Sequence, residues 1–256
     1  MTDPAAIRKG IIAYSRGLGA TLVRMCPTDR WSEHPIQQEI FHPRSIWPWA
    51  ETAIVLGIPL FAPMVATTPS MVYQELYHTS NRILDDMGYR LSSHLMSEGY
   101  RAMYFPRDCY FSVEALLDRP AAAFSHVLSA YYAGMGTIGD SHNLITKEYG
   151  PRVRMVTVLT DAMPEYDDML DEDLCIHCGK CLRECPSKAF TDKGEDIYDM
   201  DARACTEYHL ELKRQRHWPC GRCIAVCPVG EDLRSYRGSR IATDQGIEHC
   251  RTYGSR

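Results

Sequence analysis

The chain has 256 residues, of which 45% are hydrophobic and 24% are charged, and its formal net charge is −5. This composition is ordinary for a globular protein that can bury a core, and it supplies no basic face, so we expect no nucleic-acid binding. The longest apolar stretches, such as residues 52–60, are far shorter than the roughly 20 residues that span a bilayer. The N-terminus has no charged region followed by an apolar one, so we expect a cytoplasmic protein without a membrane helix.

Residues 1–166 are predicted to form an α+β body. Asp3 is a suitable cap, and Pro4 a suitable first residue, for an N-terminal helix. Apolar side chains recur in it at helical spacing, at Ile7, Ile11, Tyr14, Leu18 and Leu22. Residues 52–58 are continuously apolar, rich in β-branched side chains and followed by Pro59, which predicts a buried strand.

Three further elements are predicted in the second half of the body. Ser70 is a suitable cap for a long amphipathic helix that continues to about Ser97, before Gly99. Residues 100–105 and 153–159 have the pattern of strands, and residues 121–132 that of a helix.

Residues 167–235 are predicted to form a ferredoxin-like module, followed by a tail at 236–256 with weak patterning. An acidic stretch joins the body to this module and contains Asp167, Asp168, Asp171, Glu172 and Asp173. We interpret the stretch as a solvated linker, in preference to a docking patch for a redox partner.

Eight of the eleven cysteines lie in or between two motifs that each end in proline. The first motif is Cys175-x2-Cys178-x2-Cys181-x3-Cys185-Pro186, and the second is Cys220-x2-Cys223-x3-Cys227-Pro228. The first is the ligand run of two-cluster ferredoxins, in which the fourth cysteine binds the other cluster. Zinc is the alternative, but structural zinc sites normally pair two CxxC units across a longer spacer.

This pattern predicts two [4Fe-4S] clusters with exchanged ligands. The first cluster would be held by Cys175, Cys178, Cys181 and Cys227. The second would be held by Cys185, Cys220 and Cys223, with Cys205 as the nearest unassigned thiol to complete four ligands. The isolated Cys26, Cys109 and Cys250 are given no role, because a lone cysteine is usually a small buried apolar residue.

The segments AGMGTIG (133–139), LITKEYGPRVR (144–154) and VLTD (158–161) directly precede the cysteine motifs. This arrangement resembles the corrinoid iron-sulfur family of reductive dehalogenases and epoxyqueuosine reductases. Tyr77-His78 is also similar to a tyrosine-histidine segment of the epoxyqueuosine reductases. The resemblance implies a nitroreductase-like, cobalamin-binding body followed by a ferredoxin-like module with two [4Fe-4S] clusters.

The resemblance also implies roles for residues of the body. Gly134, Gly136 and Gly139 would let the backbone approach a flat macrocycle; the same GxGxxG spacing occurs in dinucleotide-binding turns, but here it follows a predicted helix rather than a strand. Arg152 and Arg154 could bind a cobalamin phosphate or its amide oxygens, or form surface salt bridges instead. The remaining candidates for cofactor binding are His142, Tyr149 and Gly150, and the candidate lower ligands of cobalt are His126 and His142.

Tyr77 and His78 are the candidate proton donors, because proton donation at neutral pH requires an acidic side chain near the reacting centre. Epoxyqueuosine reductases carry an acidic donor in an Asp-Thr-Ala-Pro segment after the second predicted strand. This chain has Phe105-Pro106-Arg107-Asp108 there, with Asp108 displaced by a few positions.

We therefore predict a corrinoid-dependent reductase that takes electrons from reduced ferredoxin or flavodoxin and reduces a small organic substrate. The alternative is a redox activator that binds a corrinoid, or another protein's corrinoid, without a substrate of its own. A simple ferredoxin-like carrier would need none of the residues that precede the cysteines. Flavin remains an alternative occupant of a nitroreductase-like pocket.

Overall fold

A four-stranded antiparallel sheet forms the centre of the body in the computed structural model, which describes residues 3–36, 39–195, 197–237 and 239–252. The strand order is β1 (Leu22–Pro27), β2 (Thr52–Pro59), β6 (Val153–Thr160) and β3 (Ala102–Phe105). In the register, Val55 lies opposite both Arg24 and Thr157, and Tyr104 opposite Val158. This confirms the strands predicted around residues 52–58, 100–105 and 153–159.

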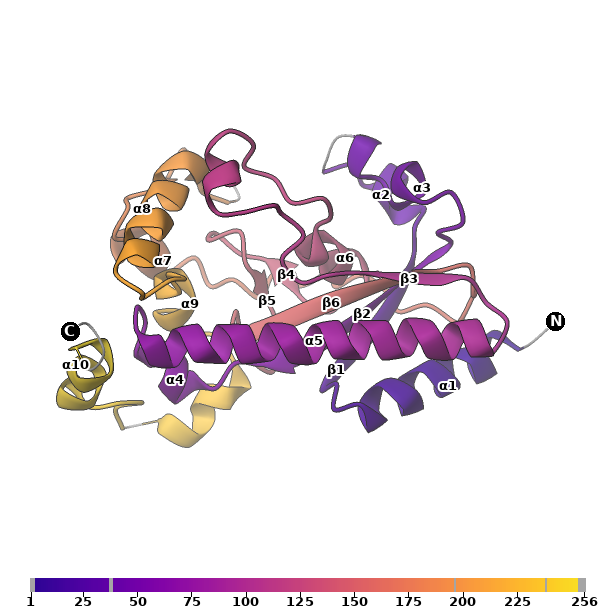
Figure 1. Ribbon diagram of the computed structural model, residues 1–256, viewed down its shortest axis with the longest axis horizontal. Helices are drawn as coiled ribbons and strands as arrows, with labels where there is room; N and C mark the ends of the chain where they lie inside the picture. The colour runs from indigo at the N-terminus through magenta and orange to yellow at the C-terminus, as the bar shows by residue number, and fades with distance from the viewer. Residues whose placement is uncertain (1–2, 37–38, 196, 238, 253–256) are drawn as a thin grey trace.

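Helices cover both faces of the sheet, which explains why β2 is apolar at consecutive positions. On one face, Ile54, Leu56 and Val158 pack against Leu84 and Leu91 of α5 (Met71–Ser97), and α1 (Pro4–Gly17) adds Ile11. On the other face, Val55 and Leu159 pack with Leu128 and Tyr132 of α6 (His126–Tyr132). Figure 1 shows α5 running along most of the length of the molecule, with α1 below the sheet.

The caps of the two long helices are as predicted. Asp3 accepts a hydrogen bond from the backbone N–H of Ala5, and Ser70 accepts one from that of Tyr73. The N-terminal helix, however, ends at Gly17, and Leu22 begins β1, because the chain turns through Gly19 with a positive φ of 99°. The predicted helix at 121–132 begins only at His126, where Ser125 caps it.

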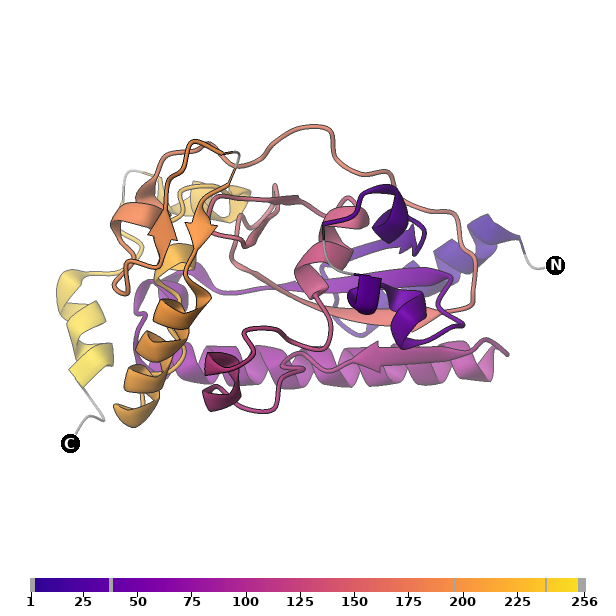
Figure 2. The ribbon, with the colours of Figure 1, turned by 90° about the horizontal axis from the view of Figure 1, so that it is seen from above.

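The acidic segment is not a free linker along its whole length. Asp167 accepts hydrogen bonds from both terminal nitrogens of Arg8, at 3.1 and 2.7 Å, and from the backbone N–H of Met25 at 2.9 Å. The solvated-linker prediction is therefore wrong for Asp167, while Asp171 and Glu172 are exposed as expected. Figure 2 shows the segment passing from the end of the sheet to the cysteine-rich part of the chain.

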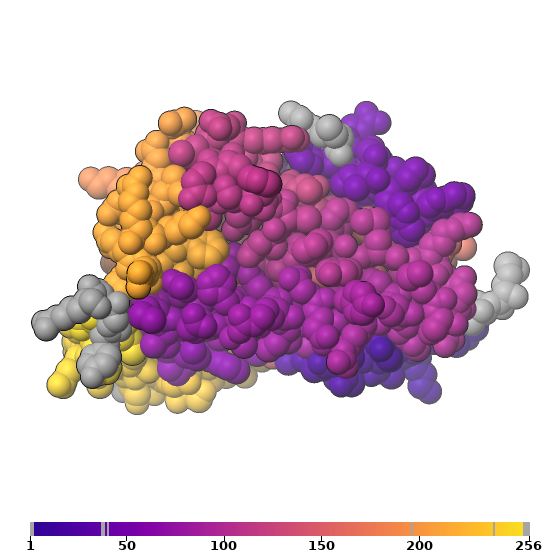
Figure 3. Space-filling view, viewed as in Figure 1, coloured from indigo at the N-terminus to yellow at the C-terminus, as the bar shows by residue number. Residues whose placement is uncertain are grey.

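The cysteine-rich part lies at one end of the molecule, beside the N-terminus of α5 (Figure 1). Its elements are α7 (Lys180–Arg183), β7 (Phe190–Thr191), β8 (Asp199–Met200), α8 (Ala202–Arg214) and α9 (Arg222–Ala225). Lys213 of α8 forms an ion pair of 2.8 Å with Glu114 of η2 (Glu114–Leu117), and Figure 3 shows this orange helix against the magenta segment that contains η2. The module therefore packs directly on the body.

The remaining short elements connect these parts. They are α2 (Arg30–Glu33), η1 (Glu39–Phe41), α3 (Pro43–Ile46), α4 (Ala62–Ala66), β4 (Thr137–Ile138), β5 (Leu144–Ile145), η3 (Glu231–Tyr236) and α10 (Asp244–Thr252). The tail, whose sequence has weak patterning, contains a helix, α10, in its described part. Within the described residues, no helix combines the length and the apolar character needed to cross a membrane.

Candidate cofactor and active site

The eight clustered cysteines lie in two neighbouring groups. Cys175, Cys178, Cys181 and Cys227 line one small cavity, which Cys223 also reaches. In the second group, the electrostatic influence of Cys185 acts on Cys205, Cys220 and Cys223, so these four thiols lie near one another. The grouping matches the two predicted ligand sets, with residues far apart in sequence brought together.

Burial makes these thiols weak acids in the absence of a bound cation. It is the largest cause that raises the pKa of Cys205 and of Cys220 to about 11, with further contributions from neighbouring thiols. Burial likewise raises the pKa of Cys181 to about 11 and that of Cys223 to about 12. Because thiolates are the ligating form, binding of iron would release these protons. The donor set of eight thiols fits iron-sulfur clusters.

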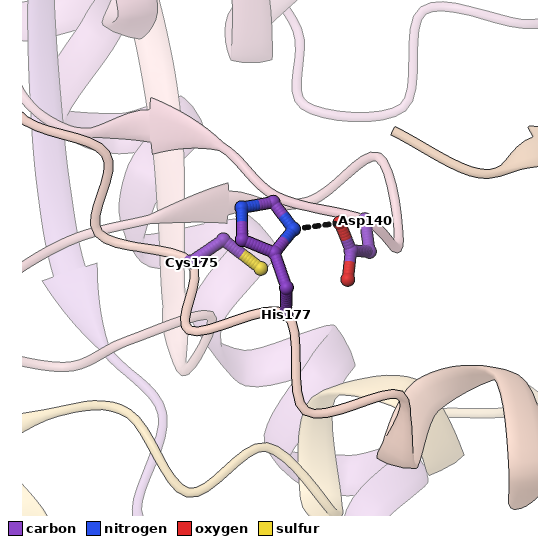
Figure 4. Close-up of side chains that lie close together, drawn as sticks. All are labelled: Asp140, Cys175 and His177. Atoms are coloured by element: carbon purple, nitrogen blue, oxygen red, sulfur yellow. Dashed lines mark hydrogen bonds and ion pairs between the residues drawn. The ribbon is translucent and has the colours of Figure 1, made fainter. Parts of the chain in front are cut away.

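A hydrogen-bonded histidine lies beside the first group (Figure 4). Ring nitrogens of His177 pair with Asp140 and Asp173, both at 2.8 Å, and the Sγ of Cys175 lies in the same cluster of possible metal ligands. Asp140 is buried, whereas His177 is exposed. Since both ring nitrogens already have carboxylate partners, we interpret the trio as support for the Cys175 loop rather than as a separate metal site.

A pocket of about 260 Å³ lies between the body and the cysteine-rich module. Its apolar wall is formed mainly by Phe124, Val127, Leu144, Val153 and Met155, and its polar lining includes Arg107, His126, Asn143 and Arg154. Ile224, which follows Cys223 directly, also lines it. The side-chain amide of Asn143 donates a hydrogen bond of 3.5 Å to the Sγ of Cys223. The pocket is therefore adjacent to the second cysteine group.

Asp108 is at the centre of a hydrogen-bonded network beside this pocket. Its carboxylate accepts hydrogen bonds from the hydroxyl of Tyr77 at 2.7 Å, from Nδ2 of Asn81 at 2.6 Å and from Nη2 of Arg107 at 3.3 Å. Arg154 lies 3.6 Å from the same carboxylate, and its guanidinium carbon is 4.1 Å from the centre of the Tyr77 ring. The structure thus brings Asp108 next to Tyr77, although their sequence positions did not indicate it.

This environment changes the acidity of both groups. Burial raises the pKa of Asp108, although the hydrogen bond from Tyr77 opposes the shift. Burial also raises the pKa of Tyr77, while the positive charge of Arg154 lowers it. The phenol is therefore protonated at neutral pH and has a cation next to its ring that favours the phenolate. Arg154, which contacts the Tyr77 ring, lines the pocket, so Tyr77 is a candidate proton source beside the pocket.

Each of the two arginines that line the pocket has one buried nitrogen without a hydrogen-bond partner among the described residues. Arg107 and Arg154 each carry five N–H groups, yet the Nε atoms of both are buried without a partner among the described residues. Buried unpaired donors are rare in proteins. The pocket is therefore suited to an oxygen-rich ligand, and amide or phosphate oxygens of a corrinoid fit this requirement in chemistry. The volume of about 260 Å³ lies slightly below the range of roughly 300 to 1,000 Å³ that is typical of sites for drug-sized organic ligands.

The structure gives the predicted glycines a different role. A Cβ atom added to Gly134 would lie 1.8 Å from the carbonyl oxygen of Asp168, and one added to Gly136 would lie 2.2 Å from that of Ile145. Gly150 has a φ of 54° and faces the carbonyl of Val229. These glycines allow close packing of one backbone segment on another. None of Gly134, Gly136, Gly139 and Gly150 lines the 260 Å³ pocket.

Arg152, in the body, forms hydrogen bonds with residues of the C-terminal part of the chain. It is only 2% exposed, and its guanidinium donates hydrogen bonds to both carboxylate oxygens of Asp232, at 2.7 and 2.8 Å. It also donates to the carbonyls of Cys227, at 3.0 Å, and Val229. Its donors are therefore used within the chain, in contrast to the predicted contact with a cofactor.

The other predicted candidates are distributed over several places. His142 pairs through Nε2 with the carbonyl of Tyr198 at 2.6 Å, so it faces the module. Tyr149 lines a separate surface cavity. His126 does line the main pocket, but its ring nitrogens pair with Thr157 and with the carbonyl of Pro106. His78 packs near Trp218, at 5.8 Å between ring centres.

Comparison with known proteins agrees with the cysteine pattern and the fold. Residues 174–231 match the model of a 4Fe-4S dicluster domain. The tetrachloroethene reductive dehalogenase of Sulfurospirillum multivorans is 35% identical over 115 residues, which are 40% of this chain and 23% of that protein. The epoxyqueuosine reductase of Listeria monocytogenes is 23% identical over 257 residues, which are 88% of this chain and 65% of that enzyme.

Solved structures of the same two kinds share the fold. A catabolic reductive dehalogenase aligns with a TM-score of 0.69 and 21% identity, over 97% of this chain and 34% of that one. An epoxyqueuosine reductase bound to a modified tRNA stem loop aligns with a TM-score of 0.61 and 16% identity, over 96% of this chain and 70% of that one. The chain thus spans about a quarter to a third of the length of the dehalogenases that it matches.

Together, the two sets of relatives and the dicluster domain relate this chain to the corrinoid iron-sulfur reductases. The coarse structural prediction from the sequence, a mixed α/β fold with a 4Fe-4S ferredoxin-like module, is confirmed at that level.

Proposed function

We propose that the chain is a cobalamin-dependent reductase in which two [4Fe-4S] clusters deliver single electrons to the pocket beside Tyr77 and Asp108. The observation that carries this proposal is the hydrogen bond between Asn143 and Cys223, because Asn143 lines the pocket and the second cysteine group therefore lies next to it. Arg154, which also lines the pocket, contacts the candidate proton donor Tyr77. A ferredoxin-like carrier has no need for such a pocket.

In this proposal the two thiol groups hold one cluster each. Cys175, Cys178, Cys181 and Cys227 bind the first cluster, and the second is bound by Cys185, Cys205, Cys220 and Cys223. The second cluster is the one close to the pocket, since Asn143 and Ile224 are shared between them.

The pocket residues of a nitroreductase-like body would position the corrinoid and the substrate. Arg107 and Arg154 would donate hydrogen bonds to amide or phosphate oxygens, and the apolar wall around Phe124 and Met155 would exclude water. Bound cobalamin supplies a cobalt centre that accepts single electrons and reduces an organic substrate.

Tyr77 would supply the proton that accompanies reduction. Its hydroxyl is held by Asp108, and Arg154 stabilises the phenolate that remains after the proton has left. Asp108, whose pKa is raised by burial, can hold a proton and return it to Tyr77. His78 has no hydrogen bond to this network, so we give the role to Tyr77.

Anaerobic reconstitution with iron, sulfide and cobalamin tests the cofactors. About eight irons and one cobalt per chain support the proposal, whereas zinc, or iron with bound flavin and no cobalt, refutes it. In the reconstituted protein, Tyr77→Phe should lower turnover of an organohalide by about 10²- to 10⁴-fold and leave reduction of the clusters unchanged. Tyr14→Phe, in α1, is the matched control. Equal turnover by Tyr77→Phe would exclude Tyr77 as the donor.

A nucleoside substrate is the second candidate, favoured by the alignment of 88% of this chain with an epoxyqueuosine reductase and by the carboxylate of Asp108 beside the pocket. The expectation of no nucleic-acid binding rested on net charge alone, and a protein of the same fold holds a tRNA stem loop. Incubation with tRNA that carries epoxyqueuosine, followed by nucleoside analysis, separates the candidates. Conversion of the nucleoside without organohalide turnover would favour this one.

A further inference from the structure

Asn143 connects the pocket to the second cysteine group through one side-chain amide. Its Nδ2 donates to the Sγ of Cys223 at 3.5 Å, to the carbonyl oxygen of Ser141 at 3.1 Å and to the hydroxyl of Ser141 at 3.0 Å. A carbonyl or a thiolate can only accept a hydrogen bond, so the nitrogen end of the amide has to face these groups. The orientation of the amide, with its nitrogen toward Cys223, is therefore fixed.

The turn between β4 and β5 holds Asn143 at this point. The backbone N–H of Gly139 donates to the carbonyl of Asn143 at 3.0 Å, and that of His142 donates to the carbonyl of Gly139 at 2.8 Å. Asn143 thus belongs to the body and lies 80 residues before Cys223 in the chain. By contrast, the backbone N–H of Ala189, which donates to the Sγ of Cys185 at 3.4 Å, belongs to the cysteine-rich part itself. The amide of Asn143 is therefore a contact between the two parts of the chain.

This hydrogen bond favours negative charge on the sulfur of Cys223. Burial raises the pKa of Cys223 to about 12, and the hydrogen bond from Asn143 opposes the shift. Reduction of an iron-sulfur cluster adds one negative charge, and hydrogen bonds to the sulfur atoms are among the features that set its reduction potential. Because a donor stabilises the more negative, reduced form more than the oxidised form, the bond from Asn143 raises the potential of a cluster bound by Cys223.

The oxygen end of the same amide can accept a hydrogen bond from a ligand. Asn143 lines the 260 Å³ pocket, and its Oδ1 has no hydrogen bond to any residue in the described part of the chain. A donor that binds Oδ1 polarises the amide and strengthens the bond from Nδ2 to the sulfur, because hydrogen bonds in a chain reinforce one another. Arg107 and Arg154 offer unpaired donors at the same pocket. A ligand with carboxamide groups supplies oxygens for these arginines and N–H donors for Oδ1.

We propose that Asn143 raises the reduction potential of the second cluster and couples this potential to the binding of a carboxamide-bearing ligand in the pocket. A ligand bound at Oδ1 raises the potential further, and by reciprocity the chain binds that ligand more tightly when the cluster is reduced. The coupling directs electrons to chains whose pocket is filled. One electron enters the cluster in this step, and no covalent bond forms or breaks. The inference rests on the proposed function for the second cluster and for a corrinoid as the ligand.

Redox titration of the iron-loaded full chain without corrinoid, followed by the EPR signals of the reduced clusters, tests the effect of Asn143 on the potential. Asn143→Leu should lower the potential of the second cluster by about 59 mV, which is a tenfold change in the ratio of reduced to oxidised cluster for one electron. Asn143→Asp keeps the size but loses the donor, and should lower the potential at least as much. The first cluster should be unaffected, and the reduction step that Cys205→Ser lacks identifies the second cluster. Gln215→Leu is the control, because this exposed amide donates to Glu211 and not to a thiol.

The same titration after addition of cobalamin tests the coupling. The potential of the second cluster should rise in the wild type, and this rise should be absent in Asn143→Leu. An equal rise in both proteins would come from the charge of the ligand alone and would overturn the coupling.

The effect of Asn143 on the potential is refuted if Asn143→Leu and Asn143→Asp keep both their iron and the wild-type potential. It is also refuted if both variants lose the iron of the second cluster, because Asn143 would then be needed for assembly. Asn143→Asp guards against a packing defect caused by leucine. Uptake of cobalamin with unchanged potentials contradicts only this inference. Two clusters without uptake of cobalamin contradict the proposed function and the coupling, while the titration without corrinoid still decides the effect of Asn143.

Discussion

Replacing Arg152 by methionine should weaken the attachment of the cysteine-rich module to the body. The change leaves the carboxylate of Asp232, 17% exposed as a side chain, without its bidentate partner. It also removes the hydrogen bonds to the carbonyls of Cys227 and Val229. Breaking a buried ion pair from one side costs about 3 to 5 kcal/mol. For a chain of this size, that lowers the midpoint of thermal unfolding by roughly 6 to 20 °C.

The same change should reduce iron binding, because Arg152 holds the backbone of Cys227, a proposed ligand of the first cluster. Differential scanning calorimetry and iron counting after anaerobic reconstitution measure the two effects. Arg101→Met is the control: this arginine forms an ion pair with Asp161 at 3.3 Å and is 56% exposed, and such pairs contribute about 1 kcal/mol or less. A double variant with Asp232→Asn should be less destabilised than the sum of the single variants.

The reasoning would be refuted if Arg152→Met unfolded at the wild-type temperature and kept its full iron content. The unfolding temperature and iron content of Arg152→Lys should lie between those of the wild type and of Arg152→Met. Lysine keeps the charge but cannot donate to both oxygens of Asp232 in the planar geometry of arginine.

Three further predictions follow from individual side chains. Burial lowers the pKa of His126 from 6.5 to about 4. As the pH falls, this histidine therefore takes up a proton in the unfolded chain before it does so in the folded chain. The stability due to neutral His126 is complete above pH 6.5, and the free energy of unfolding decreases by about 3 kcal/mol as the pH falls toward 4. Urea unfolding of His126→Gln should depend less on pH in this range, and the exposed His34→Gln should behave as wild type. Gly150→Ala should lower the unfolding temperature, because an added Cβ would lie 2.0 Å from a carbonyl oxygen and the residue has a positive φ. Gly10→Ala, in a helix with open space around it, should instead stabilise the protein by up to about 1 kcal/mol. A rise in melting temperature for both variants would contradict the packing argument. Cys205→Ser should lose the iron of the second cluster and retain that of the first, as measured by iron content and EPR, and full occupancy of both clusters would show that another residue completes the second site.

Several elements could be predicted because their cause lies within a few neighbouring residues. Ser70 caps α5 through a hydrogen bond to Tyr73, three residues away. The unbroken apolar run of β2 predicted burial on both faces. The cysteine spacing likewise predicted which thiols would meet, since a short loop with three cysteines leaves a fourth ligand to be supplied from elsewhere.

The network around Tyr77 could not be predicted in the same way. Tyr77 lies on α5 and Asp108 on the segment after β3, and their meeting depends on how α5 packs on the sheet. In the sequence, Asp108 is displaced by a few positions from the acidic donor of the epoxyqueuosine reductases. A displacement along a loop, however, does not determine the position of the side chain in the folded protein. The local signal in the sequence was the adjacent pair Arg107-Asp108, which places a cation and a carboxylate next to each other on this loop.

The sequence by itself indicated a 4Fe-4S dicluster module in this protein, because cysteine motifs and their spacing are properties of short segments. Only the tertiary structure decided what the glycines and Arg152 do. A glycine permits close approach by any neighbour, and the neighbours of Gly134 and Gly150 proved to be the backbone at Asp168 and Val229. An arginine binds any oxygen that faces it, and those that face Arg152 belong to Asp232 and to the backbone around Cys227. Glycine and arginine can each accept many different neighbours. Their actual neighbours depend on how distant segments of the chain fold together, and local sequence patterns do not contain that information.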